Sequence, residues 1–139
     1  MGVIKVKDYK LMVVYGTLMK GNHNDRFMKN AELVGEGKFK GDLYCLGGFP
    51  AVIPGEGNVI GEVYKVPIEA IHDIDRLEGY DQKTDDGMYL RRYTDVQVGN
   101  ETLDALVYIW GRSLPRHAVK WPNGERWNRG GTLHGQISL

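Results

Sequence analysis

The order of apolar and polar residues along the chain predicts a sheet-rich fold with one well-marked helix. An apolar, β-prone run over 10–15 stops at Gly16 and is typical of a buried first strand. Two more strands are expected at 89–98 and 102–110, with a hairpin turn at 99–101. The last of these strands is apolar on both faces, which predicts a central place in the sheet.

One segment has the three-residue periodicity of an amphipathic helix. Its apolar positions are Ile68, Ile71, Ile74 and Leu77. Pro67 stands where a first helical residue belongs, and Gly79 can adopt the left-handed conformation that ends a helix. A second, shorter helix is expected over 26–31, with Asn24 as its N-terminal cap.

Glycine is frequent, with nineteen in 139 residues, and many of them fall between 35 and 61. In strand-like segments glycine marks bulges and tight bends. The pattern predicts strands at 39–46 and 59–64, joined by a turn-rich connection over 47–58. Residues 1–8 alternate weakly, as a short strand would, and the chain from Gly111 onward reads as irregular.

These elements together predict an α+β fold, a small mixed β-barrel with flanking short helices. The length fits one domain over residues 1–139. Its core is expected at about 11–127, followed by an irregular tail over 128–139.

Composition narrows the classes of partner. Lys and Arg together number 18, as do Asp and Glu, so the chain lacks the cationic excess that a general nucleic-acid binder needs. The apolar runs are far shorter than the ~20 residues that span a membrane, and no signal-peptide pattern follows the start. Cys45 is the only cysteine, which excludes an internal disulfide and a thiolate metal cluster. We therefore expect a cytoplasmic protein with no membrane or nucleic-acid partner.

The segment Tyr15-Gly16-Thr17-Leu18 is the first candidate for chemistry. A strand that ends in glycine and a turn can present successive backbone N–H groups, and these can hold a carboxylate or an oxyanion. The alternative is an ordinary turn after a strand.

Glu78 is the second candidate. A carboxylate in the last turn of a helix is opposed by the negative end of the helix dipole, so it is a poor choice for stability. Such a local conflict is a reason to suspect function. The alternative is a solvated charge near Arg76 or Arg91.

Strand alternation puts Tyr89, Arg91 and Tyr93 on one face, where an aromatic ring beside a guanidinium could line an anion pocket or simply lie at the surface. Other chemistries have little support. Serine occurs only at 113 and 138, without the G-x-S-x-G pattern of many hydrolases. The four histidines, at 23, 72, 117 and 134, form no metal motif and are interpreted as surface or packing residues. Cys45 is interpreted as a small core residue.

In their order and separation, several fragments resemble the γ-glutamylcyclotransferase-like family, which includes AIG2-like and BtrG-like proteins. The fragments are Val13-Val14-Tyr15-Gly16-Thr17-Leu18, Gly47-Gly48-Phe49-Pro50-Ala51-Val52, Gly61-Glu62-Val63-Tyr64, Ile74-Asp75-Arg76-Leu77-Glu78-Gly79-Tyr80 and Tyr89-Leu90-Arg91-Arg92. The resemblance runs from about residue 11 to 127.

The resemblance implies a small mixed β-barrel with a cavity at one end. It also implies that the loop of Tyr15, Gly16, Thr17 and Leu18 binds substrate through its backbone and that Glu78 is the acid–base residue. Tyr89 would be a wall of the pocket.

The implied reaction is cyclisation of a small γ-glutamyl amide to 5-oxoproline, with release of an amine and with no cofactor or metal. The amine could be that of an amino acid, of a lysine side chain, of a polyamine or of an aminoglycoside. Two other interpretations stay open: a non-catalytic small-ligand-binding module on the same fold, and a protein-interaction domain that uses the segment 121–127.

Overall fold

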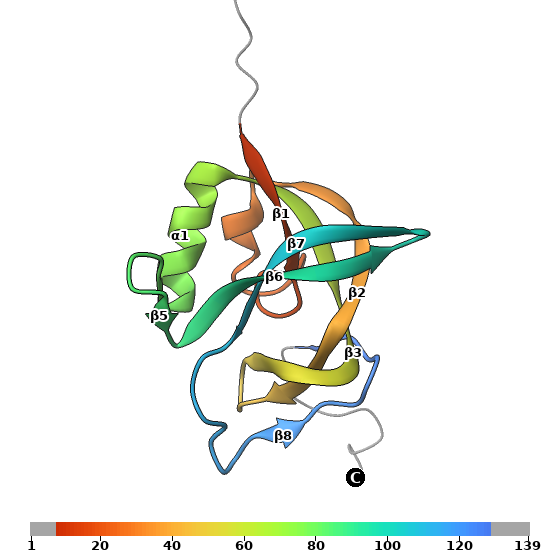
Figure 1. Cartoon of the computed structure of the whole chain (residues 1–139), viewed down its shortest axis with the longest axis vertical. Helices are drawn as coiled ribbons and strands as arrows, with labels where there is room; N and C mark the ends of the chain where they lie inside the picture. Colours follow the sequence, from red (N-terminus) through yellow and green to blue (C-terminus); the bar gives the residue numbers. More distant parts are fainter. Residues whose placement is uncertain (1–7, 129–139) are drawn as a thin grey trace, which may run out of the picture.

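The computed structural model describes residues 8–128, whose strands form a mixed sheet that curls around on itself beside a helix (Figure 1). The expectations for residues 1–7 and 129–139 lie outside the described residues. The strands are β1 (Tyr9–Val14), β2 (Glu32–Cys45), β3 (Pro50–Pro67), β4 (Tyr80–Asp81), β5 (Asp86–Gly87), β6 (Tyr89–Val98), β7 (Glu101–Trp110) and β8 (Val119–Lys120). The helices are the 3-10 helix η1 (Asp25–Met28) and the α-helix α1 (Ile68–Glu78).

The pairing of the strands runs in a ring. The order in the large sheet is β3-β1-β7-β6-β2-β8, and β2 also pairs with β3, so the pairing returns to its start. β1 and β7 are parallel, with Met12 opposite Leu106, and the other pairs are antiparallel. The predicted α+β fold with a mixed sheet is thus confirmed. β7 lies between β1 and β6, which confirms its central place.

The helix α1 forms where the apolar periodicity placed it. Ile71 and Ile74 are buried, and they pack in a core cluster with Met12 of β1 and Leu106 of β7. Gly79 has φ +69° and ends the helix, as predicted. Pro67 closes β3 and takes the N-cap position, one residue before its expected place.

The second helix differs from the prediction. It is a single 3-10 turn at Asp25–Met28, and no side-chain hydrogen bond of Asn24 caps it. The Asn24 amide instead donates to Oγ1 of Thr17 at 2.9 Å, in the loop after β1. A tertiary contact has therefore replaced the local cap.

The expected loop over 47–58 was largely wrong, because β3 already begins at Pro50. Residues 54–57, which include Pro54, Gly55 and Gly57, have no partner in the ladder with β2, where the register shifts. Proline and glycine are tolerated in a strand where the ladder is interrupted. β2 likewise starts before the expected residue 39 and includes Gly37, where a Cβ would lie 2.6 Å from a methyl group of Val96.

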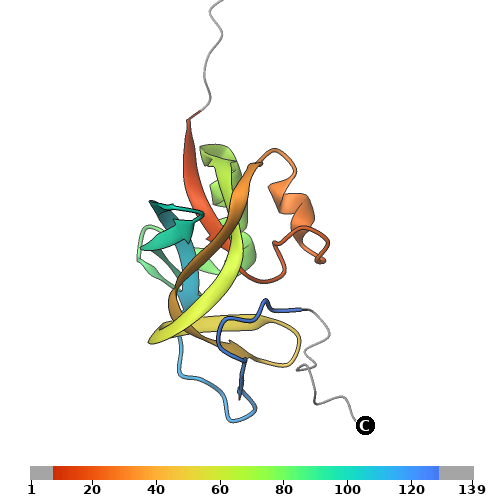
Figure 2. The ribbon, with the colours of Figure 1, turned by 90° about the vertical axis from the view of Figure 1, so that its right-hand side faces the viewer.

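The segment after β7 carries part of the core. Trp121 and Trp127 are only 3% and 2% exposed, in a cluster that also contains Tyr15 and Phe39. The segment runs beside the hairpin of β2 and β3 (Figure 2), where the Trp121 N–H donates to the Leu43 carbonyl at 2.8 Å. The two tryptophans are thus internal and not free to form the interaction surface considered above.

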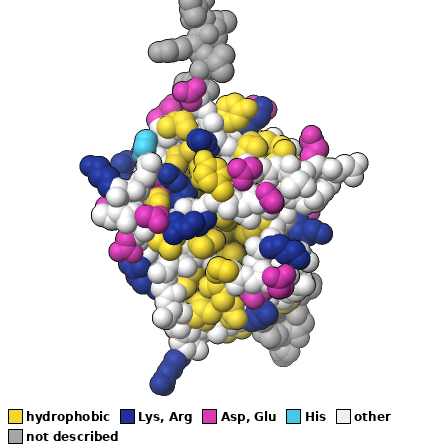
Figure 3. Space-filling model, in the orientation of Figure 1, with side chains coloured by type: hydrophobic (Ala, Val, Ile, Leu, Met, Phe, Trp, Pro, Cys, Tyr) yellow, Lys and Arg dark blue, Asp and Glu magenta, His cyan; other side chains and the backbone are white. Residues whose placement is uncertain are grey.

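On the face shown in Figure 3, basic and acidic side chains are interspersed among apolar ones, in keeping with the zero net charge. Within residues 8–128, no helix has the length and apolar character needed to cross a membrane. Cys45 is buried in the core, as predicted.

Candidate active site

A cavity of about 270 Å³ lies between the end of β1, the C-terminal end of α1 and the start of β6. All six residues singled out from the sequence line it: Tyr15, Gly16, Thr17, Leu18, Glu78 and Tyr89. Segments more than 60 positions apart in the chain therefore meet at one place.

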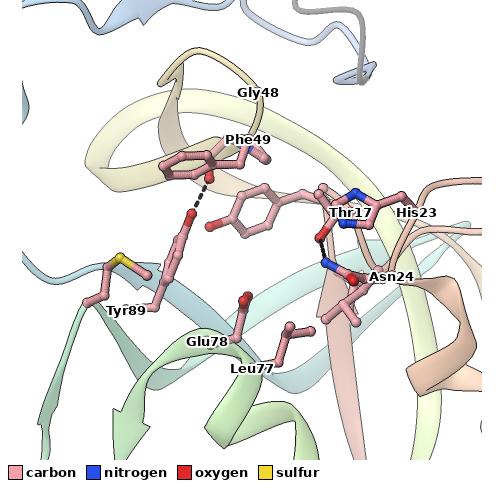
Figure 4. A pocket seen from close by; sticks show the side chains of 14 residues that line it. Thr17, His23, Asn24, Gly48, Phe49, Leu77, Glu78 and Tyr89 are labelled. Carbon is pink, nitrogen blue, oxygen red and sulfur yellow. Dashed lines mark hydrogen bonds between the residues drawn. The ribbon is translucent and has the colours of Figure 1, made fainter.

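Glu78 is the last residue of α1, and the left-handed Gly79 turns the chain away directly after it. Figure 4 shows the Glu78 carboxyl group pointing away from the helix into the cavity, with Tyr89 on one side and Thr17 on the other. Leu77, beside it, is partly buried and packs on the core cluster beneath α1. The helix thus keeps its apolar stripe inward while its last side chain enters the cavity.

Burial raises the pKa of Glu78 from its ordinary value of 4.5 to about 7. Among the described residues, no side chain makes a hydrogen bond or an ion pair with this carboxyl group that would favour its charged form. Part of the side chain stays accessible because it faces the cavity. Near neutral pH, Glu78 can therefore both accept and donate a proton.

The raised pKa of Glu78 predicts that the stability of the folded chain depends on pH. Since the folded-state pKa of Glu78 lies above its unfolded value, the folded chain holds the proton more tightly between about pH 4.5 and 7. The associated stability is complete below about pH 4.5 and is lost as the pH rises through about 7. Glu78→Gln cannot ionise at this position. Its free energy of unfolding, compared with that of the unmodified protein, should therefore increase as the pH rises from about 5 to 8. Since the carboxyl group is partly exposed, roughly 3 kcal/mol is an upper limit, at 1.36 kcal/mol per pKa unit.

Thermal unfolding of Glu78→Gln and of the unmodified protein, each at about pH 5 and about pH 8, measures this gain in stability. The control is Asp73→Asn, also in α1, because the Asp73 side chain is 56% exposed and pairs with Arg76 at the surface. A difference in stability between Glu78→Gln and the unmodified protein that stays constant with pH would contradict the prediction.

The loop after β1 is held in shape by hydrogen bonds that its own backbone carbonyl groups accept. The Gly16 carbonyl accepts hydrogen bonds from the Met19 N–H at 3.0 Å and from the Asn22 side chain at 2.8 Å. The Thr17 carbonyl accepts the Asn24 N–H at 2.9 Å. Within residues 8–128, the N–H groups of Thr17 and Leu18 donate to no other residue. Both residues line the cavity.

Glycine is required at position 16 because the loop passes close to Pro50. A Cβ at residue 16 would overlap the Pro50 ring, with Cδ 2.9 Å away. Pro50 lines the cavity as well, and its carbonyl accepts the Tyr89 hydroxyl at 2.6 Å. The Leu46 N–H donates to the Phe49 carbonyl at 2.8 Å and closes the turn between β2 and β3. These contacts join the loop, the turn and β6 into one wall.

Two tyrosine hydroxyls border Glu78 and are fixed by backbone carbonyls. The Tyr15 hydroxyl donates to the Tyr108 carbonyl at 2.6 Å, and the Tyr89 hydroxyl donates to Pro50 as described. Burial is the main cause that raises the pKa of both groups; for Tyr15 the neighbouring Tyr89 and then Glu78 add to it, and for Tyr89 Glu78 does. Both hydroxyl groups therefore stay protonated at neutral pH, where Glu78 has its pKa.

The structure adds cavity residues that the sequence did not indicate: His23, Asn24, Gly48, Phe49, Pro50 and Met88. His23 was expected to be a surface or packing residue, and it is exposed, but at the edge of this cavity. Phe49 is 37% exposed and packs on Trp110, with the ring centroids 6.3 Å apart. The Met88 N–H donates to the Gly79 carbonyl at 3.1 Å, which places Met88 at the rim beyond the hairpin of β4 and β5.

The sequence left two interpretations of Tyr89, Arg91 and Tyr93 open, an anion pocket or surface positions, and the structure separates these residues. Tyr89 lines the cavity, but Arg91 and Tyr93 face a different hollow, near Lys10 and His72. The Arg91 guanidinium is held by Asp75 at 2.6 Å and is not available to bind an anion beside Tyr89. In the part of the chain that the structure describes, no group of three or more His, Cys, Asp or Glu side chains is placed to hold a metal ion.

Comparison with known proteins gives one consistent result. A family profile described as "Gamma-glutamyl cyclotransferase, AIG2-like" matches residues 12–129. The chain is 33% identical over 102 residues to the γ-glutamylcyclotransferase family protein YtfP of Escherichia coli K12, covering 73% of this chain and 82% of that protein. It is 38% identical over 71 residues to the γ-L-glutamyl-butirosin B γ-glutamyl cyclotransferase of Niallia circulans, over 50% of this chain and 46% of that enzyme. The crystal structure of a mouse AIG2-like protein superposes with a TM-score of 0.71 at 25% identity, covering 86% and 88% of the two chains.

Proposed function

Because this chain belongs to the AIG2-like γ-glutamyl cyclotransferase family, we propose that it cyclises a small γ-glutamyl amide to 5-oxoproline and releases an amine, with Glu78 as general acid and base. One observation carries the proposal: a single carboxyl group with a pKa of about 7 lies in a cavity beside a loop with two free N–H groups. Tyr15, Gly16, Thr17, Leu18 and Tyr89 would form the walls that bind the substrate.

The reaction exchanges one carbon–nitrogen bond for another. The α-amino nitrogen of the glutamyl group attacks the γ-carbonyl carbon, and the bond from that carbon to the amide nitrogen breaks. Glu78 first takes a proton from the α-ammonium group, which frees this nitrogen to attack, and later returns that proton to the departing nitrogen. The second proton that the attacking nitrogen loses, as the lactam becomes neutral, ends on the released amine, which leaves as an ammonium ion. Both reacting groups belong to one molecule, and ring closure of this kind can reach effective molarities on the order of 10⁵–10⁸ M.

The raised pKa of Glu78 makes the first proton transfer easier. An α-ammonium group has a pKa near ~8, so transfer to an ordinary glutamate costs roughly 5 kcal/mol. With the Glu78 pKa at about 7, the difference is about one unit, or roughly 1.4 kcal/mol. Burial of the carboxyl group, which costs stability, thus lowers the barrier to proton transfer.

The loop after β1 would supply the electrostatic part of catalysis. The N–H groups of Thr17 and Leu18 have no partner among the described residues, and both residues line the cavity. Donors that are fixed in advance can hold the α-carboxylate of the substrate or the negative oxygen of the tetrahedral intermediate. Since both carbonyls of Gly16 and Thr17 are bonded within the loop, these donors are held in place without substrate.

The proposal is tested by incubating the purified protein with γ-glutamyl amides that carry different leaving amines and measuring 5-oxoproline. The matched control is the α-glutamyl isomer of each compound, whose amide lies at the wrong carbonyl for this ring closure. We expect 5-oxoproline from at least one γ-glutamyl amide and none from the isomers. Tight binding of γ-glutamyl amides without any turnover would instead favour the non-catalytic binding module.

A further inference from the structure

Arg91, on β6, contacts the chain on both sides of Glu78. Its guanidinium donates a 2.6 Å hydrogen bond to Oδ2 of Asp75, three residues before Glu78 in α1. It also lies over the ring of Tyr80, two residues after Glu78, with 5.3 Å to the centroid. The side chains of Arg91 and Asp75 are 15% and 7% exposed, so this ion pair is shielded from water. Arg91 itself lies outside the cavity that contains Glu78.

The Asp75 carboxylate extends these contacts to the rest of the site. Its second oxygen accepts the Tyr108 hydroxyl of β7 at 2.6 Å. The backbone carbonyl of Tyr108 in turn accepts a hydrogen bond from the Tyr15 hydroxyl, and Tyr15 begins the loop after β1. A buried ion pair thus connects the last turns of α1 to two central strands and to the opposite wall of the cavity.

We propose that Arg91 is a positioning residue: by holding Asp75 and Tyr80, it fixes the last turn of α1 and the direction in which Glu78 enters the cavity. The inference rests on the proposed function of Glu78. The last turn of a helix lacks part of its backbone hydrogen bonds and frays unless other contacts hold it. A displacement of about 1 Å of a catalytic group can cost about 10²-fold in rate.

The same pair places two opposite charges close to Glu78, because Asp75 precedes it by three residues in α1 and Arg91 is bonded to Asp75. The titratable and charged side chains near Glu78 come from each element packed around it: Asp75 of α1, Tyr89 and Arg91 of β6, Tyr108 of β7, Tyr15 after β1 and His23 before η1. Asp75 and Arg91 have opposite charges that offset each other, and burial is what raises the pKa of Glu78. Loss of Arg91 would leave a negative charge and raise this pKa further, whereas loss of the Asp75 charge would lower it.

The test compares Arg91→Met, Asp75→Asn and the double variant. Two quantities are measured: kcat and KM for 5-oxoproline release, and the titration midpoint of the Glu78 carboxyl group by carbon-13 NMR. We expect kcat to fall about 10- to 100-fold in all three variants with KM changed less than about 3-fold. The midpoint should rise by about 0.5–1 pH unit in Arg91→Met, fall in Asp75→Asn and return near its original value in the double variant.

Two further variants keep the test decisive. Arg92→Met, on the same strand, removes a guanidinium that pairs with the exposed Asp85, and should leave kcat and the midpoint unchanged. Arg91→Lys retains the charge but loses the planar group over Tyr80, so it should keep the midpoint and lower kcat several-fold even if Arg91→Met folds poorly.

The two proposals fail in different ways. If the unmodified protein releases no 5-oxoproline, or if Glu78→Gln retains turnover, the proposed function fails. If the unmodified protein releases 5-oxoproline and Glu78→Gln does not, but kcat stays within about 3-fold in Arg91→Lys, Arg91→Met and the double variant, the role of Arg91 alone is overturned.

Discussion

Replacing Glu78 with Gln is expected to lower the rate of 5-oxoproline release by about 10²–10⁴-fold, the usual contribution of general acid–base catalysis. The amide has nearly the shape of the carboxyl group but cannot carry the proton between the two nitrogens. Substrate affinity should change little, because the loop N–H groups that would hold the substrate carboxylate are untouched. Steady-state kinetics on the best γ-glutamyl amide, with separate kcat and KM, measures the effect.

The control for this experiment is Asp73→Asn, which removes an exposed carboxylate from the same helix. It should leave kcat unchanged. The thermal unfolding measurement described above tests loss of folding as a cause, and we expect Glu78→Gln to be the more stable protein above about pH 7. Turnover by Glu78→Gln at the rate of the unmodified protein would remove Glu78 from the mechanism.

Replacing Trp127 with Ala is expected to destabilise the fold by about 3–5 kcal/mol, as for other large buried aromatic residues. The side chain is 2% exposed and packs in the cluster that contains Phe39 of β2 and Tyr15 of the site. Its removal leaves a cavity in the core cluster to which Tyr15 also belongs. Denaturant unfolding followed by an optical signal measures the loss, and the activity of the folded fraction should fall as well.

Two other variants serve as comparisons for the loss of stability in Trp127→Ala. Trp127→Phe keeps an aromatic ring in place and loses no hydrogen bond, because the Trp127 Nε1 has no partner among the described residues, so its cost should be clearly smaller. Val119→Ala, in the same segment but 50% exposed, should change stability by no more than about 0.5 kcal/mol. A Trp127→Ala protein as stable as Val119→Ala would mean that the segment does not belong to the core.

Local patterns in the sequence correctly predicted those helices and strands whose backbone is determined by neighbouring residues. The apolar positions from Ile68 to Leu77 and the glycine at 79 define α1, and therefore the place of Glu78 at its end. The two-sided apolar character of 102–110 predicted the central strand. In each case a few neighbouring residues determine the backbone, and the wider fold agrees with them.

Other parts of the site depend on contacts between distant segments. His23 and Phe49 lie in a loop and a turn without periodicity, and their places follow from contacts such as Asn24 to Thr17 and Tyr89 to Pro50. The ion pair between Arg91 and Asp75 could not be predicted from the sequence either, because Asp75 lies sixteen positions away on another element. No pattern within one segment distinguishes an arginine that faces a ligand from one that holds a helix.

The ring of strands has a consequence for how the chain acquires its shape during synthesis. β1 pairs with β3, and its Met12 lies opposite Leu106, while the Tyr15–Tyr108 hydrogen bond joins residues 93 positions apart. Contacts of such long sequence separation cost loop-closure entropy before they return any stability, which slows folding. During synthesis β1 can therefore pair with β3 first, whereas its contacts with β7 form only after that strand has left the ribosome, so the ring of strands closes late.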